Sequence, residues 1–210
     1  MFTGLVSNIG KISTITGSDD NKSFVINHDG SLKTKISDSV SVDGACMTIT
    51  KKSLKSFTVV AMPETLNRTL FGTYKKASSV NLELPLKISD RLGGHFVTGH
   101  VDFMAKIINI DSLKGSKTLH IEFPLSFCKY FAFKGSVCVN GVSLTISKLE
   151  SRHFEVSLIP YTLKNTNLGL LKKDDYVNIE VDLISRYLDS LLKDKAKEST
   201  YQFLQERGFI

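Results

Sequence analysis

Three side chains that could do chemistry, His100, Ser143 and Cys46, stand at positions that recur along the chain. Val97-Thr98-Gly99-His100-Val101 repeats the opening Phe2-Thr3-Gly4-Leu5-Val6, with histidine in place of leucine. Histidine is the side chain whose ordinary pKa allows proton transfer near neutral pH. Cys46 aligns with Ser143 in a second repeated segment, so a thiol in one copy corresponds to a hydroxyl in the other. Positions at which the two copies differ in chemistry indicate that their roles have diverged.

Each of these residues also has an ordinary structural explanation. His100 taken alone is more often a structural histidine than a catalytic one. His95 and His100 are five residues apart, so in an extended strand they point to opposite faces, which predicts that they share no metal ion. Cys46 is either a nucleophile or a small buried side chain, and binding is favoured because no histidine adjoins it in sequence. Lys134 is either a solvated loop lysine or a cation that reaches into a site.

Identical residues in the two copies indicate a shared fold or a shared ligand. They are the pairs Thr3/Thr98, Gly4/Gly99, Gly44/Gly141, Thr48/Thr145 and Thr65/Thr162. Glycine lets the backbone approach a flat ligand closely, and a threonine hydroxyl both donates and accepts hydrogen bonds. Any single pair can be explained as a turn glycine or a strand threonine. The five pairs together predict two related pockets.

The repeat extends over the whole of each half of the chain. Residues 39–50 are identical to residues 136–147 at six of twelve positions, far above the level that composition alone would produce. Residues 57–72 align with residues 154–169 in the same order. The offset is 95 at the opening and 97 later, which places two extra residues between positions 107 and 136. The pattern indicates a duplication.

Each copy has the pattern of a small β-barrel followed, in the second copy only, by a helix. Short alternating segments flank Asp43-Gly44 as in a hairpin, and a short helix is expected between Pro63 and Gly72 and again between Pro160 and Gly169. The prediction is a mainly β chain of two tandem barrels, at 1–95 and 96–183, and a helical segment at 184–210. The apolar stripe of that helix either packs against the barrels or associates with other copies. Its members are Ile184, Tyr187, Leu188, Leu191 and Leu192, and Thr200–Leu204 is expected to add a further turn.

Composition limits the class of protein. Hydrophobic residues at 41% and charged residues at 23% are ordinary for a soluble globular protein, and no apolar run suits a membrane span. The N-terminus lacks the pattern of a signal peptide. Three cysteines with no C-x-x-C spacing predict free thiols, not disulfides or a zinc site, and a cytoplasmic location. The net charge of +6 comes from scattered lysines, even around Lys193, Lys195 and Lys197, which predicts a solvated surface and no nucleic-acid partner.

Four segments together resemble the riboflavin synthase family, in order and with its spacing, from Met1 to about residue 192. They are Met1–Val6, Gly44–Thr50, Gly93–Asp102 and Asn140–Thr145. The resemblance implies two Greek-key barrels and a cofactor-free dismutation of two 6,7-dimethyl-8-ribityllumazine molecules. One molecule becomes riboflavin and the other 5-amino-6-(ribitylamino)uracil. It also implies a homotrimer joined by C-terminal helices, an active site between subunits, and lumazine synthase as a further partner.

The resemblance also assigns substrate-binding residues to two pockets. The first pocket is expected to contain Gly4, Leu5, Val6, Cys46, Met47, Thr48, Val60, Met62, Glu64 and Thr65. The second is expected to contain Gly99, His100, Val101, Ser143, Leu144, Thr145, Ser157, Ile159 and Thr162. Lys134 is expected to reach in from the adjacent chain, and Asp182 to help hold the substrate.

A dismutation needs two like pockets with unlike reactive groups. We expect His100 and Ser143 to help deprotonate the 7-methyl group of one lumazine, with Cys46 as a third catalytic candidate. Much of the rate would come from holding the two rings face to face. Asp43 and Asn140 exchange the residue types that are common in the family, and Tyr161 stands where the family often has His or Glu. Asn140 and Tyr161 are both expected to border the second pocket.

Two other functions fit parts of the sequence. A non-catalytic lumazine or flavin carrier would have the barrels, but such carriers have generally lost the Gly-Gly-His and Gly-His residues that are present here. An oligonucleotide-binding barrel would need aromatic residues spaced along a basic face, and neither half shows that clearly. The enzyme is therefore favoured.

Overall fold

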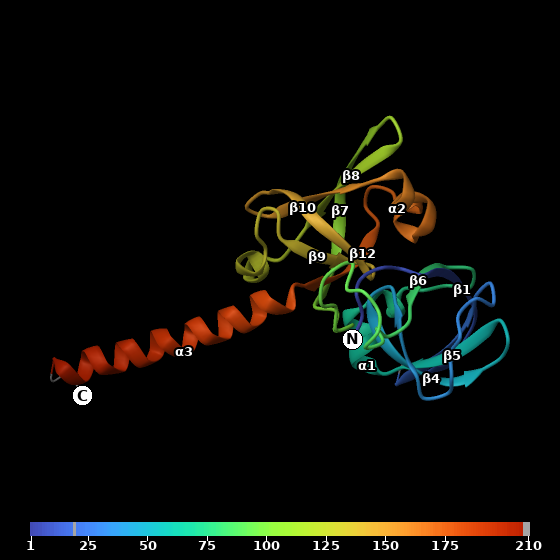
Figure 1. Ribbon diagram of the computed structural model, residues 1–210, viewed down its shortest axis with the longest axis horizontal. Coiled ribbons are helices and arrows are strands. Elements are labelled where there is room, and N and C mark those ends of the chain that lie inside the picture. Colours follow the sequence, from blue (N-terminus) through green and yellow to red (C-terminus); the bar gives the residue numbers. More distant parts are fainter. Residues whose placement is uncertain (19, 208–210) are drawn as a thin grey trace.

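The computed structural model describes residues 1–18 and 20–207, in which twelve strands close into two barrels. The first barrel consists of β1 Asn8–Ser18, β2 Asn21–Asn27, β3 Ser39–Val42, β4 Ala45–Lys52, β5 Ser56–Ala61 and β6 Ser79–Glu83. The second consists of β7 Phe103–Leu113, β8 Ser116–Glu122, β9 Ser136–Val139, β10 Val142–Leu149, β11 His153–Leu158 and β12 Tyr176–Val181. Figure 1 shows the barrels side by side, with the C-terminal helix leaving them as a single rod.

The two barrels have the same strand order. In the first, the order is β1-β2-β5-β4-β3-β6, so that β6 returns beside β3 after three consecutive neighbours, which is the Greek-key arrangement. The register shifts between Ile12 and Thr14 in β1 and between Ile107 and Asn109 in β7. Because a bulge bends and twists a strand, it helps the sheet to close. The mainly β fold with two tandem barrels is confirmed.

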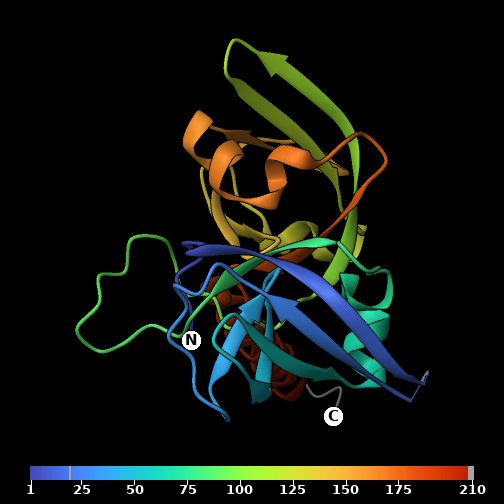
Figure 2. The same cartoon turned by 90° about the vertical axis from the view of Figure 1, so that its right-hand side faces the viewer.

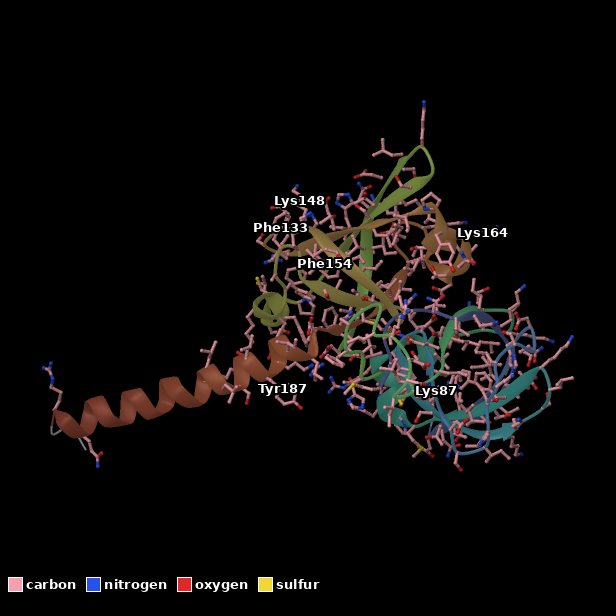
Figure 3. The ribbon with its side chains drawn as sticks, in the orientation of Figure 1. Lys87, Phe133, Lys148, Phe154, Lys164 and Tyr187 are labelled. Atoms are coloured by element: carbon pink, nitrogen blue, oxygen red, sulfur yellow. The ribbon has the colours of Figure 1, made fainter. Side chains whose placement is uncertain are left out.

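Alternating side chains fill each barrel. In β4, Ala45, Met47 and Ile49 are buried, whereas the residues between them face outward, as the period of a strand requires. Equivalent phenylalanines, Phe57 and Phe154, are fully buried in the first and second cores. Figure 3 shows Phe154 inside the second barrel. The cores are separate, so each repeat has its own apolar cluster.

The short helices end earlier than predicted. Helices α1 Pro63–Arg68 and α2 Pro160–Asn165 each start at proline, but a 3-10 turn follows in both repeats. These turns are η1 Leu70–Gly72 and η3 Asn167–Leu170. A Cβ at Gly72 would lie 2.3 Å from the carbonyl oxygen of Leu66, so glycine is needed for the 3-10 turn to pack on the helix. The two extra residues of the second repeat lie between β8 and β9, where η2 Leu125–Tyr130 occurs.

Helix α3, Leu183–Glu206, is continuous, so the further turn expected at Thr200–Leu204 belongs to the same helix as the apolar stripe. Asp182 caps it, because its Oδ1 accepts a hydrogen bond from the N–H of Ile184 at 2.9 Å. The five apolar side chains of the predicted stripe are all more than half exposed: Ile184 57%, Tyr187 65%, Leu188 54%, Leu191 62% and Leu192 65%. Tyr187 is seen projecting from the helix in Figure 3. The alternative that this stripe packs against the barrels of its own chain is therefore wrong. None of the helices in the described residues combines the length and apolar character that a membrane crossing requires.

The barrels meet through two back-to-back hairpin turns. Asp43 and Gly44 both have positive φ, as do Asn140 and Gly141, which is the type I′ geometry expected of these residue pairs. A Cβ at Gly44 would lie 2.9 Å from the backbone nitrogen of Gly141. Only glycine allows the two turns to approach this closely.

Buried asparagines join the turns with local two-fold symmetry. Asn81 Nδ2 donates to the carbonyl oxygen of Asn140 at 2.8 Å, and its counterpart Asn178 Nδ2 donates to that of Asp43 at 2.8 Å. Asn140 is only 1% exposed, so the expectation that it borders the second pocket is wrong: it lies in this junction. The buried backbone groups of both turns are thereby paired, which avoids the cost of unsatisfied polar groups.

The symmetry is broken around one carboxyl group. Asp43 accepts hydrogen bonds from Tyr74 Oη at 2.6 Å, from the N–H of Asn81 at 2.7 Å and from Asn167 Nδ2 at 2.9 Å. The second repeat has Asn140 and Leu171 in place of the aspartate and the tyrosine. Burial raises the pKa of Asp43 to about 7 from an ordinary value of 3.8, although the three hydrogen bonds act in the opposite direction.

We predict that Asp43→Asn flattens the dependence of stability on pH. With its raised pKa, Asp43 binds a proton more readily in the folded chain, so the free energy of unfolding should fall between about pH 4 and pH 7. The slope from one such group is at most about 1.4 kcal/mol per pH unit. Denaturant unfolding at pH 4.5 and pH 7 measures the difference, and the variant should lose part of it. The exposed Asp20→Asn variant is the control, and an equal loss in both would contradict the prediction.

Candidate functional site

The opening segments of the two repeats cross between the barrels. They pair with each other at the centre, where the N–H of Phe2 donates to the carbonyl oxygen of Val97 at 2.7 Å. Beyond this point the N–H of Ser143, in the second barrel, donates to Gly4 O at 2.8 Å. The N–H of Cys46, in the first barrel, donates to Gly99 O at 2.8 Å. Each barrel is therefore completed by the opening segment of the other repeat.

Two buried glutamates hold the crossed segments. Glu83, at the end of β6, accepts hydrogen bonds from the N–H and the hydroxyl of Thr3, both at 2.7 Å, and from the N–H of Gly4 at 3.0 Å. Glu180, at the equivalent place in β12, accepts the same three from Thr98 and Gly99. Hydrogen bonds to a charged group stabilise by about 1.5–3 kcal/mol each. Burial raises the pKa of Glu83, and its hydrogen bonds act in the opposite direction.

The predicted grouping of the site residues is wrong because of this exchange. Gly4, Leu5 and Val6 were assigned to the pocket of Cys46, and Gly99, His100 and Val101 to the pocket of Ser143. In the structure each triplet lies against the other barrel: Val6 packs on the second core and Val101 on the first. The predicted catalytic pair of His100 and Ser143 is consequently separated within one chain. We call the two groups the Cys46 pocket and the Ser143 pocket.

The Cys46 pocket is a cavity of about 230 Å³ on the first barrel. It is lined by Ala45, Cys46, Glu64, Thr65, Arg68, Thr69, Gly99, His100 and Val101. The thiol of Cys46 is free and exposed, and Glu64 forms an ion pair with Arg68. This pocket brings together a thiol, an imidazole, threonine hydroxyls and charged groups. It can bind a polar ring and has nucleophilic and proton-transferring groups at hand.

The Ser143 pocket contains a serine–histidine pair. His95 Nδ1 lies 2.7 Å from Ser143 Oγ, within hydrogen-bonding distance. The imidazole is 8% exposed, and burial lowers its pKa although the charges of Asp182 and Glu180 act in the opposite direction. A neutral imidazole beside a hydroxyl can accept its proton, as in other activated-serine sites. Among the described residues His95 Nε2 is buried without a hydrogen-bond partner, so this nitrogen has capacity for a bound ligand.

The loop before His95 brings it to the serine. Figure 2 shows the segment between β6 and β7 bulging sideways before it returns to the barrels. A Cβ at Gly94 would lie 2.0 Å from Thr3 O and 3.0 Å from Ser143 Cβ, so the loop closes on both only with glycine. From the sequence His95 was expected to share no metal ion and to mark the enzyme as part of Gly-Gly-His, but it was given no catalytic role. The preceding Gly93-Gly94 pair was the signal that could have identified it.

The remaining predicted residues lie around the two pockets or serve the fold. Exposed apolar side chains flank both: Val60 37%, Met62 57%, Leu5 51%, Ile159 60% and Tyr161 74%. Thr48, Thr145 and Ser157 face outward on their strands, and Thr162 lies in α2. Met47 is buried in the first core and Leu144 packs against the second, so we expect these two to offer mainly backbone groups.

Lys134 and Asp182 lie at the edge of the arrangement. Lys134 is an exposed loop residue with positive φ, and its Nζ lies 5.1 Å from the ring centroid of Phe133, in the second barrel. No contact in the described residues joins it to either pocket, so its role across subunits stays a prediction. Asp182 caps α3 and its charge acts on His95, which places it beside the Ser143 pocket.

Comparison with known proteins relates both repeats to one family. Residues 3–85 and 98–182 each match the lumazine binding domain family. The chain is 36% identical over 217 residues to riboflavin synthase of Photobacterium phosphoreum and 35% identical over 215 residues to that of Bacillus subtilis. Both alignments cover 100% of this chain and 100% of the relative. It is 37% identical over 200 residues to riboflavin synthase of Mycobacterium bovis, covering 92% of this chain and 98% of that protein.

Solved structures have the same fold. LumP complexed with riboflavin is similar with a TM-score of 0.81 and 24% identity, covering 86% of this chain and 99% of that one. LumP complexed with 6,7-dimethyl-8-(1'-D-ribityl) lumazine is similar with a TM-score of 0.78 and 24% identity. At this level of identity the likeness establishes the architecture only.

We predict that Gly99→Ala detaches the crossed segment from the Cys46 pocket. The added Cβ would lie 2.5 Å from the Cβ of Cys46, and the residue has a φ of +85°. Hydrogen exchange at the N–H of Cys46 should become faster, because this group donates to Gly99 O. Gly30→Ala is the matched control, since its φ is +96° but its nearest neighbour, Lys55 Cγ, would be 3.5 Å away. Equally fast hydrogen exchange at the N–H of Cys46 in both variants would contradict the prediction, because backbone strain alone would then explain the faster exchange.

Proposed function

The chain belongs to the riboflavin synthase family, and we propose that it converts two molecules of 6,7-dimethyl-8-ribityllumazine into riboflavin and 5-amino-6-(ribitylamino)uracil, using the Cys46 and Ser143 pockets. One molecule loses a four-carbon unit and the other gains it, so the atoms balance without a further reactant. The reaction is a transfer between two copies of one substrate. We therefore expect two binding sites that recognise the same ring system and differ in their reactive groups.

The observation that carries this proposal is the pair of related but unequal pockets. Both have a threonine or serine face on β4 or β10, a glycine backbone from a crossed segment, and an apolar rim. The first adds Cys46 and His100, whereas the second adds Ser143 and His95. The like backbone and hydroxyl groups suit two copies of one lumazine, and the unlike reactive side chains suit a donor and an acceptor.

We assign the proton transfer to His95 and Ser143 in place of His100 and Ser143. The imidazole and the hydroxyl, 2.7 Å apart, together form a general base that can take a proton from the 7-methyl group of a bound lumazine. The neutral form of His95, favoured by its burial, is the form that accepts this proton. The exposed thiol of Cys46 and the imidazole of His100 are then available to the second lumazine, as nucleophile and proton carrier.

We further propose that the two reacting lumazines meet across a subunit boundary in a homotrimer. The exposed stripe on α3 and the exposed apolar rims of both pockets support this, since such surfaces are usually covered in an assembly. Bringing the Cys46 pocket of one chain against the Ser143 pocket of another would hold the two rings together, which removes most of the entropic cost of their encounter. In this arrangement Lys134 reaches in from the adjacent chain.

Related features belong to the same proposal. We keep domain boundaries of 1–95, 96–183 and 184–210, of which residues 208–210 lie outside the described part. Three free cysteines support a cytoplasmic location. Lumazine synthase is the proposed protein partner, and co-purification with it would test this point.

The test of the function is incubation of the purified chain with 6,7-dimethyl-8-ribityllumazine alone. Riboflavin absorbance should appear together with one equivalent of 5-amino-6-(ribitylamino)uracil. A non-catalytic lumazine carrier is the rival function. Tight binding without turnover would establish the carrier and refute the enzyme.

We predict that His95→Ala lowers the turnover by about 10²–10⁴-fold, the usual range for loss of a general base. Because burial lowers the pKa of His95 from its ordinary 6.5, the wild-type rate should decline on the acid side only below that value. The variant should lose this acid limb, and added imidazole should restore part of the rate.

His28→Gln is the control for His95→Ala. His28 is also a buried histidine whose pKa is lowered by burial, but it lies beside Phe57 in the first barrel. Its variant should keep the acid limb of the pH profile. If His95→Ala instead kept the decline of the rate at acid pH, the general base would be assigned to His100.

We predict that Leu188→Glu prevents assembly and abolishes most turnover while lumazine still binds. The leucine is 54% exposed in the isolated chain, and a charge there would be buried in the proposed helical interface. Sedimentation should give three chains for the wild type and one for the variant. Ser190→Glu adds the same charge to another face of α3 and should remain trimeric. A monomeric variant with full turnover would refute the inter-subunit active site.

A further inference from the structure

A group of potential metal ligands lies on the outer face of the second barrel, apart from the His95–Ser143 pair. His120, His153 and Glu155 each offer one ligand atom, and these atoms lie within 4.8 Å of one another. All three residues are half-buried. In the described part of the chain this is the one such group of histidine, cysteine and acidic residues. Figure 3 labels Lys148, which marks this side of the second barrel.

The strands hold the three residues in place. Glu155 of β11 is the direct partner of His120 of β8 in the antiparallel ladder. His153 lies two residues before Glu155, so its side chain points to the same face. The rings of His120 and His153 are stacked, with centroids 5.8 Å apart. Ligands on neighbouring strands are positioned more rigidly than ligands on loops, which favours a defined site.

A second carboxylate orients the first histidine. Asp111 Oδ2, on β7, lies 2.7 Å from His120 Nε2. This contact places a proton on Nε2 and leaves Nδ1 free to coordinate. Metal-bound histidines commonly donate their other N–H to a carboxylate in this way, which fixes the ring and raises its basicity. Nδ1 in turn lies 3.5 Å from Glu155 Oε1.

His120 Nδ1 and Glu155 Oε1 need a positive charge between them. A neutral His120 with its proton on Nε2 offers only a lone pair at Nδ1, and the carboxylate of Glu155 also only accepts. Two acceptors facing each other repel unless a proton or a metal ion lies between them. Lys148 approaches the same carboxylate, with Nζ 3.6 Å from Glu155 Oε1, but it is also paired with Glu150 at 2.9 Å. The lysine can therefore release Glu155 and keep a partner.

We propose that His120, His153 and Glu155 bind one divalent transition-metal ion, with Zn²⁺ as the expected ion, and that Asp111 positions His120. Two imidazoles and one carboxylate are a common ligand set for zinc, whereas calcium and magnesium prefer oxygen ligands throughout. Zinc–nitrogen distances of about 2.0–2.1 Å require the side chains to draw together by small rotations. The ion would link β8 to β11. The prediction from sequence that no metal is bound rested on the cysteines and on His95 and His100, not on these residues.

The first barrel supplies an internal control. With the offset of 95 for β8 and 97 for β11, the equivalents of His120, His153 and Glu155 are Val25, Ser56 and Thr58. None of them can serve as a strong zinc ligand. The same fold therefore forms with and without the ligand set, and replacing each ligand by its first-barrel equivalent should leave the barrel intact.

The test uses the full chain freed of metal by a chelator and titrated with ZnCl₂ in a buffer that does not bind metal. We expect one ion per chain for the wild type in a calorimetric titration, and a rise in the unfolding temperature. His153→Ser should lose both, and Glu155→Gln, which keeps the shape of the side chain, should lose most of the affinity. Asp111→Asn should weaken binding by about 10–100-fold. Lys148→Met should strengthen it, because the cation that competes for Glu155 is removed.

The exposed thiols of Cys46 and Cys128 are the alternative place for an added ion. Co²⁺ separates the two, since thiolate ligation gives strong near-ultraviolet charge-transfer absorption and nitrogen–oxygen ligation does not. Circular dichroism establishes that each variant is folded. Absence of binding by the wild type, a thiolate spectrum, or unchanged binding in folded His153→Ser would overturn the proposal.

Discussion

The rest of the structure depends on the six hydrogen bonds that the carboxylates of Glu83 and Glu180 accept from the two opening segments. A carboxylate in a buried place is costly unless it is paired or hydrogen-bonded, and here backbone N–H groups and threonine hydroxyls supply the compensation. Each glutamate belongs to the same repeat as its donors, so these bonds fasten each opening segment to the last strand of its own barrel. Beyond this anchor Gly4 O accepts a hydrogen bond from the N–H of Ser143, and Gly99 O accepts one from the N–H of Cys46, so neither pocket belongs to one repeat alone.

This exchange links the duplication to the proposed chemistry. Two fused barrels that exchange their opening segments offer two sites in matched surroundings, as the proposed reaction of two lumazine molecules requires. His100 of the second repeat therefore lies at the first barrel, in the same pocket as Cys46. His95, from the linker that the duplication created between the barrels, reaches Ser143. The differences between the repeats thus fall where two copies of one substrate would need unequal treatment.

The junction between the barrels shows how symmetry and specificity coexist. Asn81 and Asn178 make equivalent hydrogen bonds across the local two-fold axis, so the turns at Gly44 and Gly141 can touch. Asp43, Tyr74 and Asn167 occur on one side only. Of the three donors to Asp43 only Asn167 comes from the other barrel, so this hydrogen bond is a contact across the junction that has no counterpart on the opposite side. This junction therefore fixes the relative placement on which both crossed pockets rely.

Much of the fold could be predicted from sequence, because it follows from local periodicity and from the repeat. Alternation along residues 45–49, the Asp43-Gly44 turn and the three-four spacing after Asp182 are local signals, and the structure has the corresponding strands, hairpin and helix. The families of residues that line the pockets were also visible as pairs. Which triplet completes which pocket was not, because the grouping depends on hydrogen bonds between the two repeats, such as the one from the N–H of Ser143 to Gly4 O. Sequence alone predicted two barrels with unequal reactive groups; only the tertiary structure decided that they exchange segments, since hydrogen bonds between segments far apart in the chain depend on where those segments lie in space.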